Sequence, residues 1–520
     1  MQLAPCLARS LARARAWAAR DPWFLAAFAV LAVATIWPIF AYRWLPFQDY
    51  PQHLAMLSIL DRLSDPDVPS SVYYTVDLWQ TPYIAFYALG AGLTKLFGVE
   101  LAGKLLLAGY VVGLGVAMTS YLNAFGRDRW AALFAFPLAF NESLFYCFVS
   151  YLLALPVVIW LLGALRRAAD APTMGRLVAI GLGATAVLYA HLQAFALYGV
   201  LALVVAVALR PALRPFLRIV AAHVPALLLA TLWLLTSGAG PNPRNPASAE
   251  AGWEPTGGVL AGMSAHLLGV YHDPSLIAID RVMVALAFAA LLLLLWRRDP
   301  PGGGLRDRIP DLLAVVALAL YFLAPSGWRF VHPINTRFLP VAAFLAAAMV
   351  RLPPTLRPWR RALCFAPVLA IGLYAARLHD RAFERFQDEV GPFEAVAEKI
   401  PENRRVMTLS FSMGSGVVRL APFVHFGQYV EVLRGGVVEY GFANFPQSPV
   451  SYVQDREPPV FPPRMEWEPC WFAESFATWG RYFQYVLVRE GPGDGCWRRA
   501  VRRPPDVHLA PWSLWSFESG

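Results

Sequence analysis

The sequence predicts a mainly α-helical protein that crosses a membrane many times and ends in a small α/β domain. Hydrophobic residues fill 58% of the 520 positions and charged residues only 15%, whereas a soluble protein carries roughly a quarter charged residues. Apolar stretches of about 20 residues, the length that crosses a bilayer as a helix, recur up to residue 378. From residue 379 onward the chain becomes charged and amphipathic.

The net charge of +9 does not indicate a nucleic-acid-binding protein. Arginines gather in short clusters between apolar segments, as the positive-inside rule describes for cytoplasmic loops. Met1–Arg20 is rich in arginine and runs into a full-length span, so we expect a cytoplasmic tail and not a cleaved signal. Short alternating segments typical of a transmembrane β-barrel do not occur. Membrane lipid is therefore the first expected partner.

Placing every arginine cluster on the cytoplasmic side gives eleven alternating spans with the C-terminus outside. The expected spans are residues 23–42, 101–125, 130–140, 147–165, 177–190, 194–209, 219–235, 282–296, 312–324, 338–350 and 362–378. The predicted membrane domain is residues 1–378, and its first outer loop, residues 43–100, is rich in aspartate. We therefore expect the domain at residues 379–520 outside the cytoplasm. The composition, rich in Ala, Arg, Leu and Pro, points to a bacterial inner-membrane protein, in which that side is the periplasm.

The count depends on one apolar run, Pro82–Gly98. If this run crossed the membrane, Arg127 would emerge outside and every later cluster would be inverted. Its 17 residues, its single Lys95 and its polar approach at Trp79–Thr81 favour a helix lying at the outer interface. The sequence therefore favours eleven spans with juxtamembrane helices in the first outer loop, and twelve spans remain the alternative.

Two segments of the C-terminal domain have the character of buried strands, Arg405–Ser410 and Tyr485–Val488. The Gly414–Gly416 stretch is too short for a dinucleotide-binding loop. Cys470 and Cys496 both lie in the region that we expect outside the cytoplasm, where a disulfide can form. The sequence leaves open whether these two cysteines are bonded to each other.

Polar residues beside the apolar layer are the candidates for function, because placing them there is unfavourable. Asp49 and His53 follow the first span four residues apart, so a helix starting at Asp49 would bring them to one face. One interpretation is a carboxylate that acts as a general base or metal ligand with a supporting imidazole. The alternative is structural, with Asp49 capping a helix that begins at Pro51 and His53 on its surface.

Three further groups fall on the same outer side. Glu142 ends the short third span, and its alternative role is a charge among lipid headgroups. His191 lies at an outer helix end. The segment Trp328–Phe338 contains His332 and Arg337, and an arginine at the mouth of a span can bind phosphate through two hydrogen bonds or simply contact headgroups. Together these groups predict an outer cavity suited to an anionic lipid-linked substrate.

Several short segments resemble the C-type glycosyltransferases (GT-C superfamily), especially bacterial relatives of protein O-mannosyltransferases. The first is the acidic opening of the first outer loop, Gln48–His53. The second runs from Thr81-Pro82-Tyr83 to Lys95-Leu96-Phe97-Gly98, and it is followed by Glu100–Leu106 and Phe125–Arg129. The layout of residues 22–378 is also similar to that of the family, whose juxtamembrane helices match the interfacial placement of Pro82–Gly98.

The resemblance implies transfer of a sugar from a polyprenyl-phosphate donor to an envelope acceptor (a glycan, lipid or protein) on the outer face. Asp49 would be the general base, Glu142 the second acidic residue, and Arg337 the group that holds the leaving phosphate. Candidate substrate-binding residues are His53, Lys95, His191, His332 and Arg337. The second outer loop carries Asn141-Glu142 where the family commonly has aspartate, which leaves open whether Asp49 and Glu142 hold a divalent metal ion as cofactor.

Two other functions remain open at this stage. A transporter or flippase for a lipid-linked glycan often shows internal repeats and broken helices at the midplane, but the polar groups here gather at one face. A non-catalytic envelope assembly protein would tolerate replacement of Asp49. The sequence identifies neither the sugar nor the acceptor.

Overall fold

The computed structural model describes residues 21–77, 81–236, 251–268, 270–272, 304–328, 331–353, 355–445, 448–456, 458–459 and 465–517. Within these residues, six helices are long and apolar enough to cross a membrane. They are α2 (Pro22–Ala41), α5 (Val99–Ala124), α8 (Val149–Asp170), α10 (Leu192–Leu209), α11 (Leu213–Thr236) and α16 (Pro358–Val390). This confirms the expectation of an integral multi-pass membrane protein.

Shorter helices occupy most of the remaining apolar stretches. They are α4 (Ala85–Phe97), α6 (Ala135–Ala139), α9 (Met174–Ala190), α14 (Ile309–Leu323) and α15 (Phe338–Ala346). The short predicted span at residues 130–140 is a 3₁₀ turn, Arg129–Phe134, that continues into α6. The span expected at residues 282–296, and most of the outer loop expected before it, lie outside the described residues.

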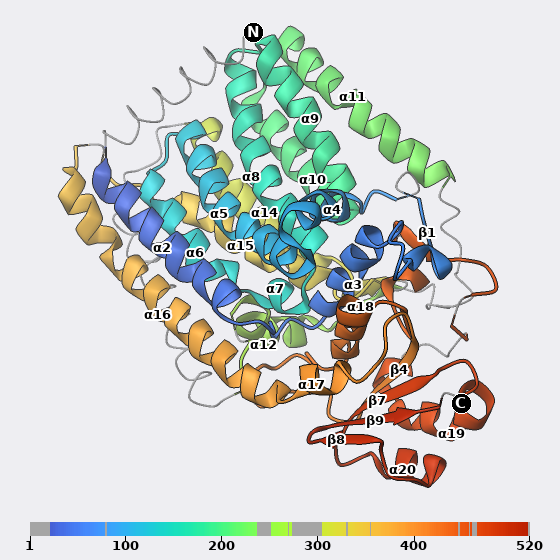
Figure 1. The fold of residues 1–520 in the computed structure, drawn as a ribbon. Helices are drawn as coiled ribbons and strands as arrows, with labels where there is room; N and C mark the ends of the chain where they lie inside the picture. The colour runs from blue at the N-terminus through green and yellow to red at the C-terminus, as the bar shows by residue number, and fades with distance from the viewer. Residues whose placement is uncertain are drawn as a thin grey trace.

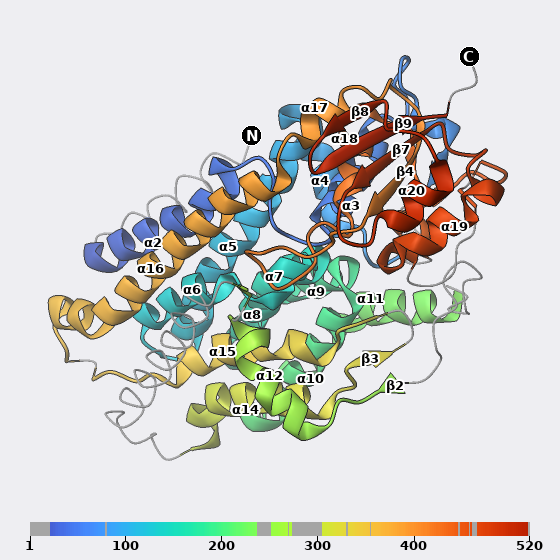
Figure 2. The ribbon, with the colours of Figure 1, turned by 90° about the horizontal axis from the view of Figure 1, so that it is seen from below.

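Helix α16 differs from the expected pattern of a span followed by a separate amphipathic helix. It runs without interruption from Pro358 to Val390 and lies along α2, as Figures 1 and 2 show. No glycine or proline interrupts the chain between Gly372 and Gly391, so nothing local stops the helix where the composition changes. It ends at Gly391, whose φ of 60° favours glycine.

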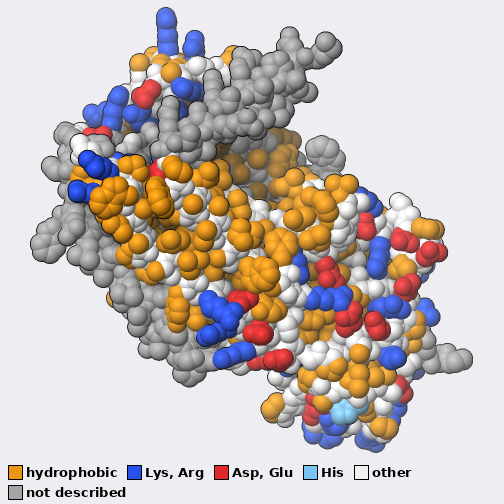
Figure 3. Space-filling view, turned by 60° about the vertical axis from the view of Figure 1, so that its left-hand side comes forward, with side chains coloured by type: hydrophobic (Ala, Val, Ile, Leu, Met, Phe, Trp, Pro, Cys, Tyr) orange, Lys and Arg blue, Asp and Glu red, His pale blue; other side chains and the backbone are white. Residues whose placement is uncertain are grey.

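The surface of the helical part is strongly apolar (Figure 3). On α2 alone, Trp23, Val33 and Trp37 have exposed fractions of 60%, 61% and 58%. Such a wide apolar surface is unfavourable in water and marks a contact with lipid. Charged side chains gather beside this surface, and many lie around the C-terminal sheet (Figure 3).

The C-terminal region forms a mixed five-stranded sheet in the order β5-β4-β7-β9-β8. The strands are β4 (Arg405–Ser410), β5 (Val437–Val438), β7 (Tyr485–Arg489), β8 (Val507–Leu509) and β9 (Trp512–Ser516). Strand β4 runs parallel to β5 and β7, whereas β9 is antiparallel to β7 and β8. Both strands predicted from the sequence are therefore confirmed, and they are neighbours in the sheet.

Both faces of β7 are buried, which explains why its residues 485–488 are continuously apolar. Val486 and Val488 point to a separate small core under α19 (Pro469–Trp479) and α20 (Gly495–Val501). Tyr485 and Leu487 point the other way, into the same hydrophobic core that contains the membrane helices. The sheet domain is therefore packed onto the rest of the protein through one whole face.

The first outer loop provides the surface on which the sheet domain packs. Strand β1 (Tyr74–Val76) pairs antiparallel with β6 (Val450–Tyr452), so the loop and the C-terminal region share backbone hydrogen bonds. Helix α3 (Tyr50–Asp61) lies against α18 (Tyr429–Arg434), and the Ser58 hydroxyl donates to the Glu431 carbonyl at 3.3 Å. Segments separated by more than 350 residues therefore form one layer, seen in Figure 2.

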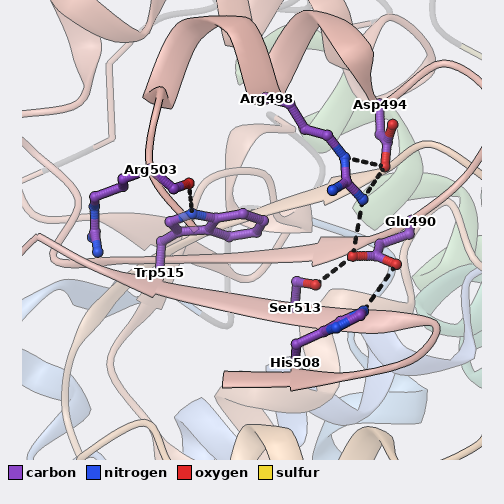
Figure 4. Close-up of polar contacts among 7 residues, drawn as sticks. All are labelled: Glu490, Asp494, Arg498, Arg503, His508, Ser513 and Trp515. Atoms are coloured by element: carbon purple, nitrogen blue, oxygen red, sulfur yellow. Dashed lines mark hydrogen bonds and ion pairs between the residues drawn. The ribbon is translucent and has the colours of Figure 1, made fainter. Parts of the chain in front are cut away.

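A polar network joins the outer strands of the sheet to α20 (Figure 4). The Glu490 carboxylate accepts hydrogen bonds from the Ser513 hydroxyl at 2.5 Å and from Arg498 at 3.3 Å. His508 Nε2 lies 3.3 Å from the same carboxylate, and the His508 side chain is 54% exposed. Exposed ion pairs of this kind contribute little to stability, so replacing His508 should change the protein little.

Cys470 and Cys496 form a disulfide that ties α19 to α20 across a sequence separation of 26 residues. Because it restricts the unfolded chain, we expect Cys470→Ser with Cys496→Ser to destabilise the sheet domain by about 2–4 kcal/mol. The thermal midpoint of the purified protein measures this effect. Reductant should lower the midpoint of the wild type and leave the double variant unchanged, while Cys364→Ser, at an exposed free cysteine, should behave like the wild type.

Candidate functional site

Asp49 occupies the N-cap position of α3, but its side chain makes no capping hydrogen bond. The carboxylate Oδ1 instead lies 2.9 Å from Nδ1 of His425. The backbone of this segment is fixed by the loop before α8, because the Gln48 amide donates to the Phe145 carbonyl at 2.8 Å and the Asp49 amide to Tyr146 at 3.3 Å. The Asp49 side chain therefore pairs with His425 and does not cap α3.

His425 belongs to the C-terminal region and lies in the loop between β4 and α18. Its ring stacks on Tyr440, with centroids 5.5 Å apart and planes 16° from parallel. Burial lowers the pKa of His425, but the hydrogen bond and negative charge of Asp49 outweigh burial, so the pKa is raised above its usual value. The imidazole is therefore a stable hydrogen-bond donor to Asp49.

Arg337 lies in the 3₁₀ turn Asn335–Arg337 that opens α15, and it is only 4% exposed. Its guanidinium carbon is 3.8 Å from the centre of the Phe148 ring, a cation–π contact. Among the residues that the structure describes, no carboxylate pairs with this guanidinium, and its Nε has no hydrogen-bond partner. A buried charge without a counter-charge is unfavourable, so an anion bound beside this guanidinium would stabilise it.

His191 compensates Arg337 only weakly. Its Nε2 lies 3.3 Å from the Arg337 guanidinium, while its Nδ1 accepts from the Gln193 amide at 3.2 Å. A neutral imidazole can accept at only one ring nitrogen, and both nitrogens here face donors. The arginine therefore keeps most of its capacity to bind an anion.

A single pocket of about 210 Å³ brings these groups together. Five of the seven residues predicted from the sequence line it: Asp49, His53, His191, His332 and Arg337. Aromatic side chains form much of the remaining wall, namely Tyr83, Tyr87, Phe148, Tyr151, Phe442 and Phe445. The pocket thus combines a carboxylate, a buried cation and aromatic faces that can pack against a sugar ring.

His53 lines the pocket but does not contact Asp49 through its ring. Its Nδ1 lies 2.9 Å from the Tyr87 hydroxyl, and Phe442 packs against the ring with centroids 4.8 Å apart. Burial lowers the pKa of His53 to about 4, so this imidazole is neutral at physiological pH. The imidazole expected to support Asp49 is therefore supplied by His425, whereas the ring of His53 is engaged by the Tyr87 hydroxyl and the backbone of Cys147.

Glu142 does not line the pocket. It begins α7 (Glu142–Tyr146), the same loop that holds the Asp49 backbone, and pairs with Arg419 at 2.7 Å. Burial raises the pKa of Glu142 to about 7, although the charge of Arg419 opposes the change. Glu142 is therefore a buried partner of the C-terminal region, and it is linked to the pocket through the α7 loop and through a hydrogen bond with Thr336, the residue before Arg337.

Lys95 lies away from the pocket. Its ammonium pairs with the Asp61 carboxylate at 2.6 Å on the surface of the first outer loop, and the Lys95 side chain is 65% exposed. The pair connects α4 to α3. Lys95 therefore joins α4 to α3 and does not line the pocket.

The acidic residues of the site do not form a set suited to a divalent metal ion. Asp49 is bonded to His425, and Glu142 is bonded to Arg419, so each carboxylate already has a partner within the protein. Among the described residues, no group of three or more His, Cys, Asp or Glu side chains could hold a metal ion.

Sequence reasoning missed His425, Arg419 and the aromatic wall from Phe442 to Phe445. His425 lies in the apolar run Phe423-Val424-His425-Phe426, and a single histidine in such a run is usually a core residue. Its only signal was that a polar side chain in an apolar run needs a hydrogen-bond partner. The sequence does not say that this partner is 376 residues away.

No protein-family model matches this sequence, and no curated protein matches it.

Proposed function

We propose that this protein is a membrane glycosyltransferase that moves a sugar from a polyprenyl-phosphate donor to an envelope acceptor on the outer face of a bacterial cell membrane. The observation that carries the proposal is the pocket, where Asp49 and the buried Arg337, which has no carboxylate partner among the described residues, line one cavity. A carboxylate can take a proton from an acceptor hydroxyl. A buried guanidinium can hold the phosphate that leaves. Few other reactions need both groups in one cavity beside a membrane.

The proposed step is a single displacement at the anomeric carbon of the donor sugar. The acceptor oxygen forms a bond to that carbon while its proton passes to the carboxylate of Asp49. The bond between the anomeric carbon and the phosphate oxygen breaks, and its electron pair leaves with the phosphate. Arg337 stabilises the added negative charge, because a cation that is held in place before the reaction needs no reorganisation as the charge develops.

The arrangement of the helices supports placing this pocket at the outer surface. Asp49 follows α2, His191 joins α9 to α10, and Arg337 begins α15, so the pocket residues come from loops at one end of the helical bundle. The sheet domain lies at that same end (Figure 1). The disulfide between Cys470 and Cys496 suits an oxidising compartment outside the cytoplasm.

We also propose eleven crossings with a cytoplasmic N-terminus. Helix α4 is amphipathic, and its one charged residue, Lys95, pairs with Asp61 of α3, which suits a helix that lies in the membrane interface. It ends at Gly98, whose φ of 78° allows α5 to begin at the next residue. An α4 that lies at the outer interface keeps Arg127 on the cytoplasmic side.

Cysteine labelling in intact spheroplasts tests this topology. In a background without other free cysteines, Arg127→Cys should react with a membrane-impermeant maleimide only after permeabilisation. Lys399→Cys, at an exposed position in the sheet domain, should react without it. Labelling of Arg127→Cys in intact spheroplasts would show that α4 and α5 both cross and that the eleven-span topology is wrong.

The proposed activity is tested with the full-length protein in lipid nanodiscs. Polyprenyl phosphates carrying different radiolabelled hexoses are offered as donors, with an envelope fraction from cells lacking the protein as acceptor. We expect label to move from the organic phase into the acceptor fraction and free polyprenyl phosphate to accumulate. The absence of transfer from every donor, together with movement of intact donor across the bilayer of proteoliposomes, would identify a flippase instead.

A further inference from the structure

The Asp49 carboxylate accepts a hydrogen bond from His425, a residue of the C-terminal domain. We infer that His425 is a positioning residue, which holds the carboxylate of Asp49 so that its second oxygen faces the acceptor hydroxyl. This inference rests on the proposed function, because it assigns a task to a residue of the same site. It also makes the C-terminal sheet domain a necessary part of the reaction centre.

The contact has the geometry that this task requires. His425 Nδ1 lies 2.9 Å from Asp49 Oδ1, and the two side chains are only 10% and 15% exposed. A hydrogen bond to a carboxylate is strong and directional when water is excluded. With Oδ1 occupied by the imidazole, the rotation of the carboxylate is restricted.

The position of the His425 imidazole is fixed relative to α3, the helix that begins at Asp49. Its ring stacks on Tyr440, and the Tyr440 carbonyl accepts a hydrogen bond from Gln52 of α3 at 3.4 Å. The Gln52 side chain also accepts from the Phe442 amide at 3.1 Å. Gln52 therefore joins α3 to the segment that supports His425, and the position of the imidazole is set relative to Asp49.

The same segment of the sheet domain continues into the pocket. Phe442, Phe445 and Ser448 line the cavity on the side of His53 and Tyr87. The same part of the C-terminal domain therefore supports the His425 imidazole through Tyr440 and forms part of the pocket wall through Phe442, Phe445 and Ser448. A domain that only anchored or stabilised the helices would not need to supply both.

In the proposed step, His425 keeps its own proton. The Nδ1–H group donates to Oδ1 before the reaction, and it still donates to Oδ1 after the other oxygen of Asp49 has received the acceptor proton. The imidazole therefore contributes orientation and does not carry the transferred proton. Its removal should slow the chemical step and leave donor binding at Arg337 largely intact.

Two substitutions separate positioning from packing. His425→Asn keeps an N–H group close to the position of Nδ1 but loses the ring that stacks on Tyr440. His425→Phe keeps the ring and loses the hydrogen bond. If His425 positions Asp49, the Phe variant should lose roughly 100-fold in kcat with a nearly unchanged donor KM, because small misplacements of a reacting group have effects of this size. The Asn variant should retain most of the rate, whereas a packing role predicts the reverse order.

A second measurement does not depend on activity. In a double-mutant cycle on the thermal midpoint, Asp49→Ala and His425→Phe should be non-additive by about 1–2 °C, because each change removes the hydrogen bond between the two side chains. His508→Phe, at an exposed histidine that also pairs with a carboxylate, should alter neither the rate nor the effect of Asp49→Ala. Additive midpoints, or a Phe variant as fast as the wild type, would overturn the inference. If the wild type transfers no sugar, the proposed function fails and the cycle alone decides whether the pair exists.

Discussion

Replacing Asp49 with asparagine is expected to slow sugar transfer by roughly 10²–10⁴-fold, the range that general-base catalysis contributes. Asparagine has nearly the same shape and can still accept the hydrogen bond from His425, so the fold should not change. It has no basic carboxylate, so the acceptor hydroxyl has no group to receive its proton. Because the donor phosphate is assigned to Arg337, the KM for the donor should change little. Initial rates of label transfer in nanodiscs measure both quantities.

A second acidic residue of the same loop provides the control. Asp61 pairs with Lys95 on the surface of the first outer loop, so Asp61→Asn should retain the wild-type rate. Asp49 makes no capping hydrogen bond to α3, which means that a loss in Asp49→Asn cannot be explained by an uncapped helix. Transfer by Asp49→Asn at half the wild-type rate or more would remove Asp49 from the mechanism.

Replacing Arg337 with methionine should reduce kcat by roughly 10²–10³-fold, as expected when a group that stabilises developing negative charge is removed. The same change should leave the thermal midpoint of the ligand-free protein unchanged or raise it. Methionine still packs against Phe148, and the substitution removes a buried charge that has no counter-charge among the described residues. A gain in stability with a loss of activity is the pattern of a binding site that is strained when empty.

Arg489 is a matched control for this prediction. It is also buried, with an exposed fraction of 7%, and its guanidinium also lies over a phenylalanine ring, that of Phe423. Unlike Arg337, it donates to two backbone carbonyls, those of Ser412 at 2.7 Å and Glu389 at 3.1 Å. Arg489→Met should therefore lower the thermal midpoint. An equal loss of stability in Arg337→Met would show that Arg337 has a structural role and is not an anion-binding residue.

The pocket explains why the candidate residues are scattered along the chain. Asp49, His191 and Arg337 follow or precede different helices, and each loop alone contains too few polar groups to bind a substrate. The bundle brings the loops to one end, where Phe442 and Phe445 of the sheet domain line the same pocket. A site of this kind depends on the packing of the whole protein, so substitutions that loosen the contact between β1 and β6 should also disturb it.

The sequence by itself determined the membrane class, the sequence ranges of most helices and two strands of the sheet. These features follow from local patterns, because a membrane helix needs an unbroken apolar run and a strand buried on both faces needs consecutive apolar residues. Residues 405–410 and 485–489 form strands where that rule predicts them. The sequence also identified Asp49 and Arg337 as candidates, because charges beside an apolar layer are rare and conspicuous.

Only the tertiary structure decided which of these groups meet. The sequence paired Asp49 with His53 because they are four residues apart, but the partner of Asp49 is His425, 376 residues away. It placed Glu142 and Lys95 with the substrate, and the structure pairs them with Arg419 and Asp61 outside the pocket. The physical reason is that a hydrogen bond or ion pair depends on a few ångströms in space, and no local pattern records the distance between residues that the packing of sheet and helices brings together.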